Sequence, residues 1–155
     1  MRAMRRSDRE ITDRNDIEDI IKKSSVCRLA MADGNRPYII PLNFGYRDNV
    51  LYFHSARDGK KIDILRKNPQ ICFEFDIGHE LITAEKSCDW GMKYKSVIGF
   101  GTASLVEDMD QRHEALAIIM RQYSTANHEF DEATVNKTAI IKVEIEMMTG
   151  KKKGY

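Results

Sequence analysis

The sequence has little of what disulfide-stapled, zinc-binding or membrane-spanning proteins need. Its 155 residues include three cysteines, three prolines and one tryptophan. Cys27, Cys72 and Cys88 are widely spaced and form no C-x-x-C pair, which indicates neither a disulfide framework nor a zinc site. No stretch approaches the roughly 20 apolar residues of a membrane span, and no apolar run follows the first arginines as in a secretory signal. These absences favour a protein of the reducing cytoplasm that has no membrane partner.

The sequence also has no large excess of positive or negative charge. The chain has 25 Lys and Arg against 24 Asp and Glu, for a formal net charge of +1. Nucleic-acid-binding domains are usually strongly basic, so no nucleic-acid partner is expected. No H-x-x-x-H pair or carboxylate cluster predicts a metal site, and neither a Walker-type loop nor G-x-G-x-x-G is present.

The length predicts one domain over residues 1–155, because domains usually have roughly 100–200 residues. We expect residues 1–10 to form a flexible N-terminal arm and residues 150–155 a solvated basic tail.

The hydrophobic pattern predicts a mainly β protein with appended helices. Apolar residues at helical spacing indicate helices over 14–23, within 58–69 and over 110–123. Short alternating runs indicate six or seven strands, over 26–31, 37–46, 50–55, 70–76, 80–85, 93–108 and 138–147. Because hairpins join most strands and helices do not alternate with them, the pattern favours a small antiparallel barrel over a parallel α/β sheet. Pro37 and Pro41 suggest a sheet edge or bulge, and Gly99 and Gly101 a bend.

The most informative stretch is FHSARDGKKID. A strand ends in His54 and Ser55, a polar loop with Gly59 follows, and Lys60 and Lys61 open a helix. Helix-opening N–H groups, a hydroxyl and two ammonium groups together suit a phosphate monoester. The alternative is a solvated turn with two surface lysines, because short motifs also arise by chance. His54 lies on the face opposite the expected core, either as a hydrogen-bonded structural residue or as a proton donor.

Several longer strings, in order, resemble one known family. PLNFGYRDNVLYFHSARDGKKIDILRKNPQICFEFD and CDWGMKYKSVIGFGTASLVED are similar to the pyridoxamine 5′-phosphate oxidase-related flavoproteins, and most similar to their 5-nitroimidazole-resistance (Nim-like) branch. The resemblance covers nearly the whole chain after the N-terminal arginines. It implies a split β-barrel that forms a homodimer and binds FMN in clefts at the dimer interface.

The resemblance also implies roles for individual residues. The FMN phosphate would be held by Ser55, Lys60 and Lys61 of the polar loop. The isoalloxazine ring would be approached by Pro41, Leu42 and Asn43 at a strand edge. The cleft would be completed from the other subunit by Tyr94, Ser96 and Val97 of a second strand. His54 occupies the position of a functional histidine that faces the substrate.

The function that the resemblance implies is an FMN-dependent oxidoreductase for small electrophiles such as nitroaromatic compounds. The phosphate loop carries Gly-Lys-Lys where the oxidases proper have Ser-Arg-Lys, so pyridoxamine phosphate oxidation itself is not expected. Two alternatives stay open. One is a flavin-binding carrier or sensor without substrate chemistry of its own, and the other is a haem- or tetrapyrrole-binding split barrel.

Overall fold

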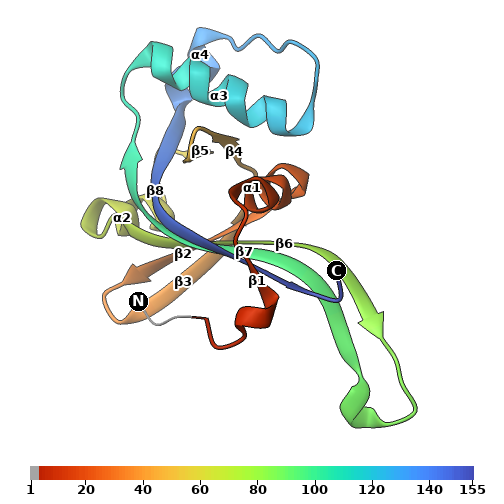
Figure 1. Cartoon of the computed structure of the whole chain (residues 1–155). Coiled ribbons are helices and arrows are strands. Elements are labelled where there is room, and N and C mark those ends of the chain that lie inside the picture. The colour runs from red at the N-terminus through yellow and green to blue at the C-terminus, as the bar shows by residue number, and fades with distance from the viewer. Residues whose placement is uncertain (1–3) are drawn as a thin grey trace.

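The computed structural model describes residues 4–155 and shows a curled antiparallel sheet with helices around it (Figure 1). In this part of the chain the sheet has eight strands, in the order β3-β2-β6-β7-β8-β5-β4, with β1 beside β8. The strands are β1 Glu10–Ile11, β2 Cys27–Asp33, β3 Arg36–Leu42, β4 Gly45–Arg47, β5 Val50–Ala56, β6 Gln70–Ile82, β7 Gly91–Leu105 and β8 Thr138–Lys153. The helices are α1 Arg14–Lys23, α2 Lys60–Lys67, α3 Met109–Tyr123 and α4 Glu132–Lys137, with 3-10 turns at Ser7–Arg9 and Ser87–Asp89.

This arrangement confirms the predicted antiparallel split barrel and adds elements to it. The two-residue β1 is additional, and the strand expected over 37–46 is divided into β3 and the three-residue β4. The separate strand expected over 80–85 is wrong, because residues 80–82 are the end of β6. The additional helix is α4, a six-residue helix capped by Asp131. The strand with both prolines, β3, is an end strand of the sheet, as expected for residues that lack an N–H donor.

The core lies inside the curl of the sheet. Alternate residues of the strands face inward, among them the fully buried Phe53, Phe73 and Phe75. Helix α1 covers one opening of the curl with its apolar face, where Ile21 is fully buried. Asp13 caps this helix by accepting a hydrogen bond from the N–H of Asn15. In residues 4–155 we find no helix long and apolar enough to cross a membrane.

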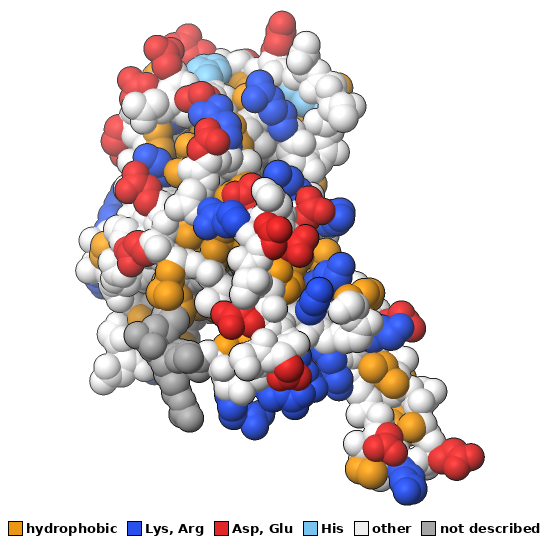
Figure 2. Space-filling view, viewed as in Figure 1, with side chains coloured by type: hydrophobic (Ala, Val, Ile, Leu, Met, Phe, Trp, Pro, Cys, Tyr) orange, Lys and Arg blue, Asp and Glu red, His pale blue; other side chains and the backbone are white. Residues whose placement is uncertain are grey.

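The β6–β7 hairpin extends well beyond the body of the molecule (Figure 1), and Figure 2 shows it as a narrow projection at the lower right. Its pairing shifts register between Ile77 and Glu80, and a second irregularity lies between Phe100 and Gly101 where β7 pairs with β8. The second shift lies at the glycines of β7, where a bend is expected, but the residue left without a pairing partner there is Glu146 of β8.

At both chain ends the structure differs from what the sequence predicts. Of the expected N-terminal arm, residues 1–3 lie outside the part that the structure describes. The flexible arm over 1–10 is wrong for its last residues, because Glu10 pairs with Lys151 and the adjacent Ile11 is 6% exposed. The solvated basic tail expected over 150–155 is also wrong, because β8 continues to Lys153 and pairs with both β1 and β7. A run of lysines looks solvated in sequence, but its backbone completes the sheet here.

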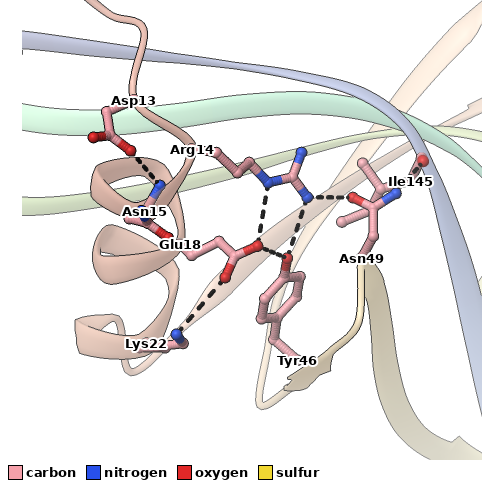
Figure 3. Close-up of polar contacts among 8 residues, drawn as sticks. All are labelled: Asp13, Arg14, Asn15, Glu18, Lys22, Tyr46, Asn49 and Ile145. Carbon is pink, nitrogen blue, oxygen red and sulfur yellow. Dashed lines mark hydrogen bonds and ion pairs between the residues drawn. The ribbon is translucent and has the colours of Figure 1, made fainter.

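A polar network joins helix α1 to β4 and β8 (Figure 3). Arg14 donates from Nη2 to Oδ1 of Asn49 at 2.6 Å and from Nε to Oε1 of Glu18 at 3.2 Å. The Tyr46 hydroxyl donates to the same Glu18 oxygen at 3.0 Å, and Asn49 Nδ2 donates to the carbonyl of Ile145 at 2.8 Å. Burial opposes ionisation of Glu18, but the hydrogen bonds from Tyr46 and Arg14 outweigh it and lower the pKa of this carboxyl.

The lowered pKa of Glu18 makes the network pH-dependent. Its stabilising effect is fully present above the ordinary glutamate pKa of 4.5 and is lost as the pH falls through the lower folded-state pKa. We expect Glu18→Gln to lower the free energy of unfolding by about 1 kcal/mol near neutral pH. The difference from wild type should shrink in acid, as measured by urea unfolding at both pH values. Glu85→Gln, in the projecting hairpin, is the control, and an equal loss in both variants would contradict the assignment.

Candidate functional site

An open groove lies between the edge strand β3 and the N-terminal end of α2. Its volume is about 370 Å³, within the range of about 300–1,000 Å³ typical of small-molecule sites. One side is apolar and comes from β3; the other is polar and comes from the end of β5, the following loop and the start of α2. The lining residues are Tyr38, Ile40, Pro41, Leu42, Ser55, Asp58, Gly59, Lys60, Lys61 and Ile62.

The start of α2 is left without a side-chain cap. Gly59 occupies the N-cap position with φ +133°, a backbone conformation that residues with a Cβ rarely adopt. Its carbonyl accepts the first helical hydrogen bond from the N–H of Asp63 at 3.1 Å. Because glycine has no side chain to accept from the first-turn N–H groups, these donors remain available to an anion in the groove.

The two lysines add positive charge at the same point. Lys60 is exposed, and its Nζ lies 4.5 Å from the centroid of the Tyr38 ring across the groove. Lys61 is partly buried, and this burial lowers the pKa of its ammonium group. A cation that has lost part of its hydration gains from a nearby dianion, so the polar side of the groove suits a phosphate.

The groove brings together five of the nine cofactor residues expected from the sequence: Pro41, Leu42, Ser55, Lys60 and Lys61. Asn43 follows the end of β3, is exposed and does not line it. Tyr38 also lines the groove, because period-two alternation places it on the same side of the strand as Ile40 and Leu42. The sequence analysis did not single out Asp58, which the short polar loop contributes.

The remaining three expected residues lie on β7, three strands away from β3. With strands about 4.8 Å apart, that separation is about 14 Å. Tyr94 and Ser96 are partly buried and share the outer face of the sheet. Val97 is fully buried and points into the core beside Phe75, so it contributes no side chain to that face.

The outer face carries an apolar row that crosses five strands. Cross-strand pairing aligns one residue from each of β3, β2, β6, β7 and β8. In that order they are Ile39, Ala30, Cys72, Phe100 and Met147. Ile39 is 61% exposed and Phe100 40%, although both are large apolar side chains. We call this set the outer apolar row; Tyr94 and Ser96 lie farther along the same face of β7.

His54 is exposed and lies outside the groove. It is adjacent to Ser55 in β5, and successive side chains of a strand point to opposite faces. Its cross-strand neighbour is Ile140, which belongs to the small apolar cluster under α3 and α4. Within one chain, the structure therefore separates His54 from the lysines of α2.

The fold and the groove together define a class: an antiparallel split barrel with an uncapped, lysine-flanked helix N-terminus beside an apolar strand edge. Comparison with known proteins gives this class its family. Residues 13–152 match the family model described as pyridoxamine 5′-phosphate oxidase, and the chain belongs to that family.

Solved structures show the same architecture. A candidate 5-nitroimidazole antibiotic resistance protein from Bacteroides thetaiotaomicron is 35% identical with a TM-score of 0.84, over 92% of this chain and 85% of that one. The flavocytochrome Anf3 from Azotobacter vinelandii has a TM-score of 0.87 at 16% identity, over 99% of this chain and 73% of that one. A FAD and haem binding protein from Mycobacterium smegmatis has a TM-score of 0.86 at 15% identity, over 95% and 74%. At such identities the last two show the fold alone.

Among curated proteins, an uncharacterized protein of Rhizobium meliloti is 30% identical over 64 residues, 41% of this chain. The match spans 42% of that relative's length.

Proposed function

We propose that this protein is a homodimeric FMN-dependent oxidoreductase that reduces small electrophiles such as nitroaromatic compounds. The observation that carries the proposal is the groove, where Ser55, Lys60 and Lys61 surround an uncapped helix N-terminus beside Pro41 and Leu42. FMN joins a phosphate to a flat aromatic ring system, so it matches a groove with one cationic and one apolar side. When bound, the flavin would supply the electron-transfer chemistry, while the chain positions it and controls access.

A dimer would bring together the two separated sets of proposed cofactor residues. Pro41 lies on the edge strand β3, and Tyr94 and Ser96 lie on β7, three strands away and farther along the outer face. Packing two copies through the outer apolar row would cover Ile39 and Phe100. A two-fold axis through such an interface repeats each contact in both directions, so β7 of one subunit could complete the groove of the other.

Phe100→Glu tests this interface. A carboxylate in the middle of the outer apolar row would be buried without a partner, so we expect the dimer to dissociate and FMN affinity to fall with it. Sedimentation equilibrium measures the mass, with Ser104→Glu, an exposed site farther along β7, as the control. A Phe100→Glu protein that keeps the wild-type mass would show that the interface lies elsewhere.

The proposed substrate class rests on the 35% identity to the Bacteroides thetaiotaomicron protein. The test is anaerobic: the FMN-loaded protein is reduced with a reduced nicotinamide nucleotide or with dithionite, and a 5-nitroimidazole is then added. We expect the flavin absorbance to bleach on reduction and return as the nitro compound is consumed. Reoxidation no faster than for free reduced FMN would indicate a flavin carrier or sensor, and a Soret band on reconstitution would indicate a tetrapyrrole-binding protein.

His54 is the proposed proton donor to the reduced substrate. Because it lies outside the groove of its own chain, its removal should leave the flavin site intact. We expect His54→Ala to slow nitro reduction at least about tenfold, in the range of general acid catalysis, with FMN affinity unchanged. His113→Ala, on α3, is the matched control. Undiminished turnover in His54→Ala would remove this role.

We also place the reaction in the cytoplasm. The three cysteines are unpaired in the structure, and a reducing compartment keeps them so.

A further inference from the structure

A second polar pocket lies where the loop after β5, the last turn of α2 and the start of α3 meet. Its volume is about 50 Å³. This volume is far below the roughly 300–1,000 Å³ of sites for larger ligands, so the pocket suits a single small group. The lining residues are Arg57, Arg66, Leu105, Val106, Glu107, Arg112, Ala139 and Ile140.

Arg112 is the buried charged residue of this pocket, with 4% of its surface exposed. Its Nε donates to the carbonyl of Val106 at 2.8 Å, and its Nη2 donates to Oε2 of Glu107 at 3.1 Å. These contacts use two of the five N–H groups that a guanidinium carries. The Glu107 side chain is 78% exposed, so this carboxylate is well hydrated and neutralises the buried cation weakly.

Arg57 and Arg66 add two further cations at the exposed rim of the same pocket. Three arginines therefore line this pocket, together with one exposed glutamate, Glu107. The other lining residues are apolar, and an apolar wall strengthens the attraction between these cations and an anion. Arginine is the side chain best suited to phosphate, because its planar N–H groups bind two oxygens at once.

We propose that Arg57, Arg66 and Arg112 form a second oxyanion site that binds a phosphate group, either free phosphate or the head group of a small phosphate ester. It is distinct from the groove, which shares none of its lining residues. Arg57 lies between Ser55 and Asp58 of the groove, so one short loop serves both sites. The proposal does not depend on the identity of the cofactor in the groove.

The experiment is a titration of the full-length protein with inorganic phosphate at constant ionic strength, followed through the backbone amide NMR signals of Val106 and Ile140. We expect saturable binding that is at least tenfold weaker in the Arg57→Gln/Arg66→Gln double variant and unchanged in Lys60→Gln/Lys61→Gln. Both arginines are exposed, so the fold should persist. Glycerol phosphate in the same titration distinguishes an ester ligand from free phosphate.

Lys67→Gln is the matched control, since it removes one exposed cation from the same helix end as Arg66 without lining the pocket. If phosphate binding were weakened equally in this control, the effect would come from the net charge of the protein and not from a local site, which would overturn the proposal. Non-saturable shifts at these amides, or binding lost only in the Lys60→Gln/Lys61→Gln variant, would overturn it as well. The Lys60→Gln/Lys61→Gln variant alters the groove, and the Arg57→Gln/Arg66→Gln variant alters the second pocket. A failure of the flavin proposal and a failure of the second site therefore show up in different variants.

Discussion

Reversing both lysine charges, Lys60→Glu with Lys61→Glu, is expected to weaken FMN binding by about 100-fold or more. Each charge-assisted hydrogen bond contributes about 1.5–3 kcal/mol, and a loss of 1.4 kcal/mol is a tenfold change in affinity. The new carboxylates would also repel the phosphate at the only part of the groove that carries paired cations among its lining residues. Quenching of flavin fluorescence on titration with the protein measures the affinity.

The control for this prediction is Lys67→Glu, compared with Lys60→Glu alone. Both sites are exposed on α2, but Lys60 lines the groove at the start of the helix and Lys67 is its last residue. We expect a loss of affinity in Lys60→Glu and little change in Lys67→Glu. Equal effects would mean that the helix contributes net charge and no local phosphate site.

The second large effect is on stability, at Gly45 in β4. A Cβ added here would lie 2.6 Å from the backbone nitrogen of Ile119 and 2.8 Å from the carbonyl carbon of Ile118. These atoms belong to the backbone of α3, so they cannot turn aside as a side chain can, and the helix must shift. We expect Gly45→Ala to lower the free energy of unfolding by about 1–3 kcal/mol or more. Thermal unfolding should show a fall in Tm of several degrees.

Gly34→Ala separates this close approach from the general effect of changing a glycine. Gly34 has φ +60° in the β2–β3 turn, with nothing within 4 Å of an added Cβ, so only backbone strain applies. The expected cost there is about 1–2 kcal/mol. A Gly45→Ala protein as stable as wild type would contradict the observed contact between β4 and α3.

The parts of the molecule that sequence predicts well are those with local causes. Asp13 and the isoleucines of α1 mark that helix because a cap and an apolar face both lie within a few residues. The loop from Ser55 to Lys61 is equally local, and the structure places both ends of it in one groove. The barrel class follows from alternation and hairpin spacing, which are also short-range.

The parts that sequence does not reveal depend on distant pairing. The lysines of 151–153 look like a solvated tail until β7 and β1 are seen to pair with them. Val97 matches a family motif, but only the register with β6 shows that it faces the core. Arg57, Arg66 and Arg112 carry no common motif, because three separate elements bring them together.

The central claim is that the groove between β3 and α2 holds FMN in a dimer, and one measurement tests it most directly. The purified protein is incubated with excess FMN, freed of unbound flavin by gel filtration, and examined by visible spectrum and by mass. The account predicts an oxidised flavin spectrum that co-elutes with a dimer at one FMN per subunit. A colourless protein that takes up no FMN would contradict it.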